Sequence, residues 1–215
     1  MGTVILDIDG TLVASAPIHR RAFQEILGEH GIFCDPDPFL GLSTEQAFEE
    51  MLRDRPGLMD ISVLADEKRR RATELMSAVP DLVIPGAIDV LNELSEQYRL
   101  ALCSSGSRRT VAVARERGLP VDLCEVVITA EDCVESKPHP EPYLTCLARL
   151  GVSADSAMAV EDTVVGISSA LAAGVRGLLV SSVALGKERD EAIDWGRVQI
   201  VENLASVPSA IGKLA

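Results

Sequence analysis

The sequence predicts an α/β fold in which a doubly wound, Rossmann-like parallel sheet carries an inserted helical domain. Three observations support this: short apolar runs, helical patterns between them, and one long helical stretch after the first run. Runs that are apolar throughout suit strands covered on both faces, as the strands of a parallel sheet are. Regular alternation of such strands with helices is typical of doubly wound sheets.

Five apolar runs are the expected strands, at residues 4–6, 100–103, 125–128, 157–160 and 177–180. Apolar residues at helical spacing lie between several of these runs. The examples are Ile88, Leu91 and Leu94 in one segment and Leu144, Leu147 and Leu150 in another. Glycine readily adopts the left-handed conformation that ends many helices. It follows three of the expected helices, at Gly118, Gly151 and Gly174.

Residues 15–79 interrupt this alternation because their pattern is almost entirely helical. One apolar stripe consists of Ile18, Ala22, Phe23, Ile26 and Leu27. Ser43 and Gln46 have the spacing of a capping box, which begins a second helix, and residues 64–76 form a third helical pattern. We therefore expect a core formed by residues 1–14 and 80–215, with a helical domain formed by residues 15–79.

Composition limits the classes of function. The 215 residues include 20 basic and 33 acidic side chains, a net charge of −13, so no basic surplus is present to bind nucleic acid. The five cysteines lack CxxC spacing and suit reduced thiols. No basic region precedes the first apolar run and no apolar stretch reaches membrane-spanning length, so we expect a cytoplasmic protein that does not bind membranes.

The segment Asp7-Ile8-Asp9-Gly10-Thr11 directly follows the first expected strand. Ligands of doubly wound sheets bind beyond the carboxyl ends of the strands. Residues one apart in an extended segment point the same way, so both carboxylates are expected to face one crevice. Two such charges need a cation, a proton or a wide gap, and Mg²⁺ with its oxygen ligands suits phosphate chemistry. The alternative is an ordinary turn that caps the next segment.

Four motifs in chain order resemble the haloacid dehalogenase superfamily, in its phosphatase and phosphomutase branch. The first is the Asp7–Thr11 segment, and the second is Ser104 within residues 100–107. The third is Lys137 within residues 135–142, and the fourth is Glu161-Asp162 together with the segment that continues to Gly174. The helical block lies where the family carries its α-helical cap, so residues 15–79 are expected to be that cap.

The resemblance implies a role for each motif residue. Asp7 would be the nucleophile that forms an aspartyl-phosphate, and Asp9 would protonate the leaving oxygen and then activate water. Ser104, Ser105 and Lys137 would bind the phosphoryl group. Mg²⁺ would be held by Asp7, the carbonyl of Asp9, and Asp162, with Glu161 acting through water. The implied substrate is a small phosphorylated metabolite.

Residues of the cap and of the second motif are further candidates. His19 and Gly41 occupy positions where related enzymes contact the substrate or the active site. An ordinary surface histidine is the alternative for His19. The basic run Lys68 to Arg71 is interpreted as a solvated helix face, although Lys68 could anchor a second phosphate. Arg108 and Arg109 either reach a second anionic group or balance local acidity.

Two departures from the family pattern separate the candidate functions. The first linker lacks an acidic residue, since it reads Ala14-Ser15-Ala16-Pro17. Enzymes of the β-phosphoglucomutase type carry an arginine where this chain has Thr44, and a mutase must hold a second phosphate. Phosphomonoester hydrolysis is therefore favoured. Phosphosugar mutase activity and a noncatalytic binding protein on the same scaffold remain the alternatives.

Overall fold

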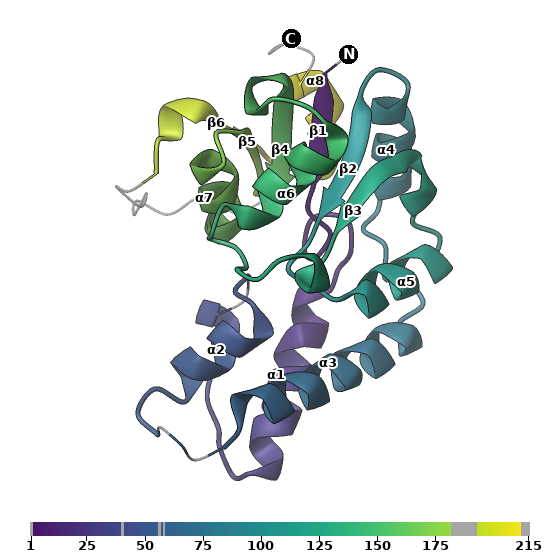
Figure 1. The fold of residues 1–215 in the computed structure, drawn as a ribbon. Helices are drawn as coiled ribbons and strands as arrows, with labels where there is room; N and C mark the ends of the chain where they lie inside the picture. The colour runs from purple at the N-terminus through teal and green to yellow at the C-terminus, as the bar shows by residue number, and fades with distance from the viewer. Residues whose placement is uncertain (1, 40, 56, 58, 182–192, 212–215) are drawn as a thin grey trace.

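A computed structural model describes residues 2–39, 41–55, 57, 59–181 and 193–211, and its centre is a six-stranded parallel sheet (Figure 1). The strand order is β3-β2-β1-β4-β5-β6, and every neighbouring pair is parallel. The strands are β1 (Thr3–Leu6), β2 (Arg99–Cys103), β3 (Cys124–Ile128), β4 (Ala157–Glu161), β5 (Arg176–Val180) and β6 (Val198–Val201). This is the predicted Rossmann-like topology, with β1 at the centre.

Helices cover both faces of this sheet. They are α4 (Ala87–Ser95), α5 (Arg108–Glu116), α6 (Glu141–Leu150), α7 (Val164–Ala172) and α8 (Val207–Ile211). Alternate residues of β1 point to opposite faces, as strand geometry requires. Val4 and Leu6 pack in the cluster that includes α4, α5 and α8, whereas Ile5 packs in the cluster that includes α6 and α7. Val4, Ile5 and Leu6 are therefore all apolar because both faces of the strand are covered.

All five expected strands are present, whereas β6 was missed by the sequence analysis. β6 has the sequence Val-Gln-Ile-Val and lies at one edge of the sheet. Gln199 and Ile200 are not buried. The helix-ending glycines were predicted correctly, since Gly118, Gly151 and Gly174 have φ values of 96°, 66° and 83°. Short 3-10 helices occur at Asp37–Phe39, Val121–Leu123, Ala130–Asp132, Ala154–Ser156, Trp195–Arg197 and Leu204–Ser206.

The inserted segment forms three helices, α1 (Ala16–Glu29), α2 (Thr44–Met51) and α3 (Ile61–Ala78), below the sheet in Figure 1. Ile18 of α1 and Met76 of α3 join a cluster of the sheet, whereas most of the buried apolar residues of the three helices form a cluster of their own. At its centre the rings of Phe23 and Phe48 lie edge to face, 5.0 Å apart. The capping box of Ser43 and Gln46 begins α2 as predicted.

Two adjacent linkers connect the inserted helices to the sheet. The amide of Ala14 donates to the carbonyl of Leu82 at 2.9 Å, and the amide of Ile84 donates to the carbonyl of Leu12 at 2.9 Å. The chain therefore leaves and re-enters the sheet domain at one place. As a result, α1, α2 and α3 lie next to the carboxyl ends of the strands (Figure 1).

Two features of the chain relate to the expected reduced thiols and to the expected absence of a membrane span. The five cysteines carry free thiols. Among the residues that the structure describes, no helix is long and apolar enough to cross a lipid bilayer.

We predict that Phe48→Ala destabilises the chain by about 3–5 kcal/mol, because it leaves a cavity in the cluster of inserted helices. Phe48 is fully buried. Phe33→Ala is the matched control, since the Phe33 side chain is 88% exposed. Urea denaturation of both variants measures the difference in the free energy of unfolding. Equal stability of the two variants would show that this cluster adds little to the fold.

Candidate active site

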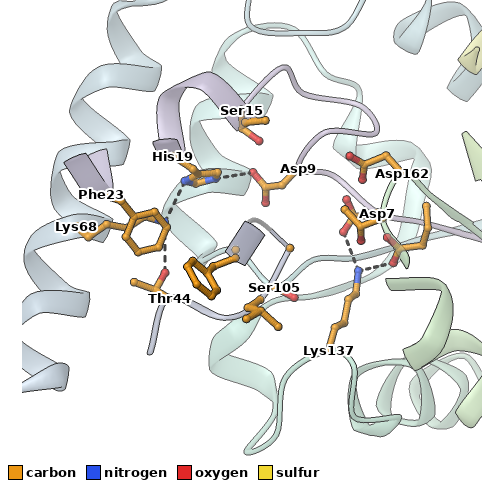
Figure 2. Close-up of a pocket in the computed structure, with 17 residues that line it drawn as sticks. Asp7, Asp9, Ser15, His19, Phe23, Thr44, Lys68, Ser105, Lys137 and Asp162 are labelled. Atoms are coloured by element: carbon orange, nitrogen blue, oxygen red, sulfur yellow. Dashed lines mark hydrogen bonds and ion pairs between the residues drawn. The ribbon is translucent and has the colours of Figure 1, made fainter. Parts of the chain in front are cut away.

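The predicted chemical residues meet at the carboxyl ends of three neighbouring strands. Asp7 directly follows β1, Ser104 directly follows β2, and Glu161 ends β4. Because β1 is paired with both β2 and β4, these strand ends are adjacent. Lys137 reaches the same place from the loop between β3 and α6 (Figure 2).

Lys137 is the buried cation at the centre of this arrangement, with 3% of its surface exposed. Its Nζ donates to Oδ1 of Asp7 at 2.7 Å, to Oε1 of Glu161 at 2.6 Å and to the carbonyl of Cys103 at 2.7 Å. Burial alone would lower the pKa of Lys137, but the charges of Asp7 and Glu161 raise it well above its usual value. Lys137 therefore stays charged and joins three strand ends.

Asp7, Glu161 and Asp162 form an acidic cluster in which ligand oxygens lie within 4.8 Å of one another. Burial raises the pKa of Asp7 to about 8 even though Lys137 opposes the shift. Burial and the charge of Asp7 raise the pKa of Asp162 to about 7. Three crowded carboxylates exceed the charge of one lysine, so a divalent cation with oxygen ligands fits this site.

Two residues of the first motif shape the surroundings of Asp162. Thr11 Oγ1 donates to Oδ1 of Asp162 at 3.2 Å. Gly10 has a φ of 91°, and a Cβ at this position would overlap the Asp162 carboxylate. The glycine of the motif is therefore needed both for its backbone conformation and for the close approach of β4.

Asp9 faces a different environment from Asp7. Its Oδ1 lies 3.1 Å from Nε2 of His19, and its Oδ2 accepts a hydrogen bond from Ser104 Oγ at 2.9 Å. Burial would raise the pKa of Asp9, but the interaction with His19 and, to a smaller extent, the hydrogen bond from Ser104 outweigh burial and lower it. The two aspartates of one motif thus have pKa values shifted in opposite directions.

Lys68 corrects the interpretation of the basic run as a solvated face. It is 5% exposed, and its Nζ lies 3.1 Å from Nδ1 of His19, 3.4 Å from Oγ1 of Thr44 and 4.3 Å from the centre of the Phe23 ring. Burial lowers its pKa to about 8. Lys68 is buried because it lies one helical turn from Leu64, on the face of α3 that packs against the other inserted helices.

The other three residues of the run point elsewhere. Arg69 pairs with Glu45, Arg70 pairs with Glu74, and Arg71 pairs with Glu25 and Glu74.

The protonated Lys68 can only donate a hydrogen bond, so Nδ1 of His19 accepts it and the ring proton lies on Nε2. Burial and the charge of Lys68 lower the pKa of His19, so a neutral ring donates to Asp9.

A cavity of about 100 Å³ separates the strand ends from the inserted helices. The predicted residues on its wall are Asp7, Asp9, His19, Gly41, Ser105, Lys137, Glu161 and Asp162. Phe23, Phe39 and Leu42 form its apolar side. Ser104 does not line this cavity, because its hydroxyl is turned to Asp9 and accepts from the amide of Gly106 at 2.8 Å.

Gly41 brings the inserted segment against the strand ends. It has a φ of 99°, and a Cβ there would lie 3.3 Å from Cγ2 of Thr163, the residue after Asp162. A larger residue would therefore strain the backbone and press on Thr163.

A family model of haloacid dehalogenase-like hydrolases matches residues 1–174. The chain belongs to this family. Hexitol phosphatase A from Escherichia coli is 33% identical over 84% of this chain and 83% of its own length. The structure of CbbY from Rhodobacter sphaeroides with phosphate is 25% identical, with a TM-score of 0.81 over 96% of each chain. A β-phosphoglucomutase from Clostridium difficile shares the fold, at 20% identity and a TM-score of 0.83 over 99% of this chain and 96% of its own.

Membership of this hydrolase family, together with relatives that are named phosphatases, supports the assignment of the chain as a phosphatase. Family members generally use a divalent metal, and the acidic cluster of Asp7, Glu161 and Asp162 suits one.

Two predicted candidates of this haloacid dehalogenase-like hydrolase lie away from the cavity. Arg108 forms an ion pair with Asp132 at 3.0 Å. Arg109 lines a groove between α3 and α5 together with Arg69 and Arg70. Of the two interpretations offered for these arginines, the structure favours the balancing of local acidity for Arg108.

Tyr143 is a buried polar residue beside the site that the sequence pattern does not single out. Its hydroxyl donates to Oε1 of Glu161 at 2.6 Å. Tyr143 also belongs to the apolar face of α6, so its spacing in the sequence predicts only a core position.

We predict that Mg²⁺ raises the melting temperature of this hydrolase, because a cation relieves the repulsion within the acidic cluster. At a concentration 100 times the dissociation constant, binding adds about 2.7 kcal/mol, which corresponds to roughly 5–10 °C for a chain of this size. Asp162→Asn should lose most of this shift. The control is Asp155→Asn, because Asp155 is exposed and precedes β4 at the opposite end of the strand. Equal shifts in both variants would place the cation elsewhere.

Proposed function

We propose that this chain hydrolyses phosphomonoesters of a small metabolite, with Mg²⁺ as cofactor and an aspartyl-phosphate on Asp7 as intermediate. The observation that carries the proposal is the position of Asp7. Its carboxylate contacts Lys137 and lies within the acidic cluster, on the wall of a cavity that it shares with Asp9. A nucleophile, a proton-transfer group and a cation thus surround one space.

The metal would be held by the Asp7 and Asp162 carboxylates and the carbonyl of Asp9, with Glu161 beside them. When bound, Mg²⁺ supplies positive charge against the acidic cluster and the substrate phosphate. Lys137 supplies a second, fixed positive charge in contact with Asp7. These charges allow an anionic nucleophile to approach an anionic ester.

In the first step, an Asp7 carboxylate oxygen attacks phosphorus while the bond from phosphorus to the ester oxygen breaks. Asp9 carries the proton that it takes from water in the second step of each cycle, and it passes this proton to the departing oxygen, so the leaving group departs as a neutral alcohol. Lys137 balances the charge on the phosphoryl group. Ser105 is positioned to donate a hydrogen bond, because its buried hydroxyl has no hydrogen-bond partner among the described residues and the residue lines the cavity.

In the second step, water attacks the phosphorus of the aspartyl-phosphate and the bond to Asp7 breaks. Asp9 takes the proton of this water, and inorganic phosphate leaves. The lowered pKa of Asp9 suits this half of the reaction, since the carboxylate is the form that accepts a proton. His19 and Ser104 hold Asp9 in place through both of its oxygens.

We further propose that residues 15–79 act as a cap that encloses the substrate. The cavity under these helices is small and has both an apolar side and a cation, Lys68. Among the described residues the Lys68 ammonium has neutral polar neighbours, His19 and Thr44, and no carboxylate partner. It is therefore available for an oxygen-rich or anionic part of the leaving group. The resemblance to hexitol phosphatase A supports a sugar phosphate or polyol phosphate.

We predict that Asp7→Asn abolishes phosphate release, because an amide is too weak a nucleophile to form the intermediate. Asp9→Asn should lower turnover by about 10²–10⁴-fold, which is the usual worth of a positioned proton-transfer group. The measurement is inorganic phosphate release from a panel of sugar and polyol phosphates with Mg²⁺. Near-native turnover by Asp7→Asn would contradict the aspartyl-phosphate mechanism.

Phosphosugar mutase activity is the second candidate, and the buried Lys68 is the observation that favours it. A mutase must hold a bisphosphate intermediate while it reorients. A lysine beside Thr44 offers one point charge, whereas an arginine offers a bidentate clamp. Charge-assisted contacts are about twice as strong as neutral ones, so Thr44 is a poor substitute for an arginine. Hydrolysis is therefore the favoured outcome.

We predict that phosphate release exceeds isomerisation when the enzyme is given β-glucose 1-phosphate, with and without the 1,6-bisphosphate. Inorganic phosphate and glucose 6-phosphate are followed in parallel. The panel of sugar and polyol phosphates provides the reference rate of hydrolysis. Bisphosphate-dependent formation of glucose 6-phosphate that is faster than phosphate release from every ester in the panel would establish the mutase instead.

A further inference from the structure

Tyr143 is a fully buried polar side chain that the proposed reaction does not use. It lies on α6 with none of its surface exposed, and its hydroxyl donates to Oε1 of Glu161 at 2.6 Å. We propose that Tyr143 is a positioning residue that holds Glu161, and through it Lys137, in the geometry that catalysis needs. This inference rests on the proposed function, since it concerns how Lys137 is held against Asp7.

Glu161 is confined on two sides. Its Oε1 accepts from both the Tyr143 hydroxyl and Lys137 Nζ, each at 2.6 Å. On the other side lies Gly166 of α7, where a Cβ would overlap the Glu161 carboxylate. Glu161 is 1% exposed, so bulk solvent has little access to this carboxylate. Its orientation therefore depends on the two donors that share Oε1.

The two donors are carried by one compact loop and helix. The carboxylate of Glu141, in the first turn of α6, accepts from the amides of Val134 at 2.9 Å and Glu135 at 2.8 Å. This ties the start of the loop to the helix that carries Tyr143. Nζ of Lys137 lies 5.4 Å from the centre of the Tyr143 ring. The same unit thus fixes the lysine, the tyrosine and the distance between them.

Removal of the Tyr143 hydroxyl would change how strongly Asp7 and Glu161 each attract the Lys137 ammonium. The ammonium is shared between Asp7 and Glu161, at 2.7 Å and 2.6 Å. Without the phenol, Oε1 of Glu161 loses one of its two donors and its negative charge acts more strongly on Lys137. Because Lys137 and Glu161 are buried, this change is only weakly screened by solvent. Lys137 is then drawn toward Glu161 and away from Asp7, where the phosphoryl group must be bound.

The test compares the two tyrosines of the chain. Tyr143→Phe keeps the buried ring and removes only the hydroxyl, whereas Tyr98→Phe is the same change at a position outside the cavity wall. With a phosphoester and Mg²⁺, we expect kcat of Tyr143→Phe to fall about 10-fold with KM within 2-fold. Tyr98→Phe should match the unchanged enzyme. A packing role alone would lower stability without this selective loss of kcat, and an unchanged kcat would overturn the proposal.

A double-mutant cycle tests whether Tyr143 acts through Glu161. In the Glu161→Ala background, adding Tyr143→Phe should change kcat by less than 2-fold, because the acceptor of the hydroxyl is gone. A full 10-fold loss in that background would overturn the proposal.

A crystal structure of Tyr143→Phe provides a measurement that does not depend on turnover. We expect Nζ of Lys137 to have moved out of hydrogen-bond distance from Oδ1 of Asp7. An unchanged contact would overturn the inference even if the enzyme is active. Absence of phosphate release by the unchanged protein would instead overturn the proposed function, while the crystal structure would still decide the role of Tyr143.

Discussion

The buried ammonium of Lys137 is the interaction on which the site depends. It joins Asp7 after β1, the Cys103 carbonyl on β2 and Glu161 on β4, so it requires three parallel strands to end at the same level. The registers of β1 with β2 and β4 align the strand ends, since Leu6 pairs with both Leu102 and Val160. A buried charge is tolerated only when it is paired and hydrogen-bonded. The order of the strands and the chemistry of the site therefore constrain each other.

Charge balance explains why two aspartates of one motif differ. Asp7 shares a solvent-poor space with Glu161 and Asp162, and one lysine does not neutralise three carboxylates. Asp9 is two residues further along and is stabilised by hydrogen bonds from His19 and Ser104. Opposite environments give opposite pKa shifts, which is how two identical side chains acquire different chemical roles. A divalent cation fits the first group, whereas the second accepts a proton in the proposed reaction.

Sequence reasoning predicted the sheet, the inserted helices and the carboxylates at the strand ends, because these follow from local patterns and topology. It failed where the direction of a side chain depends on packing. Lys68 was interpreted as solvated, yet it lies over the Phe23 ring on the buried face of α3. Tyr143 looked like an ordinary core residue of α6. Ser104 was placed correctly at its strand end, but only the structure shows its hydroxyl turned to Asp9.

The inserted helices meet the sheet domain at residues that adjoin the reacting groups. Ser136, next to Lys137, donates to Oε1 of Gln46 at 3.1 Å, and the same amide oxygen accepts from the backbone of Ser43 at the start of α2. Gly41 packs on Thr163, next to Asp162. The segment that shapes the cavity thus also touches both loops that carry the charged groups. In the proposed reaction, selection of the substrate and alignment of the reacting groups therefore depend on the same contacts between the inserted helices and the sheet domain.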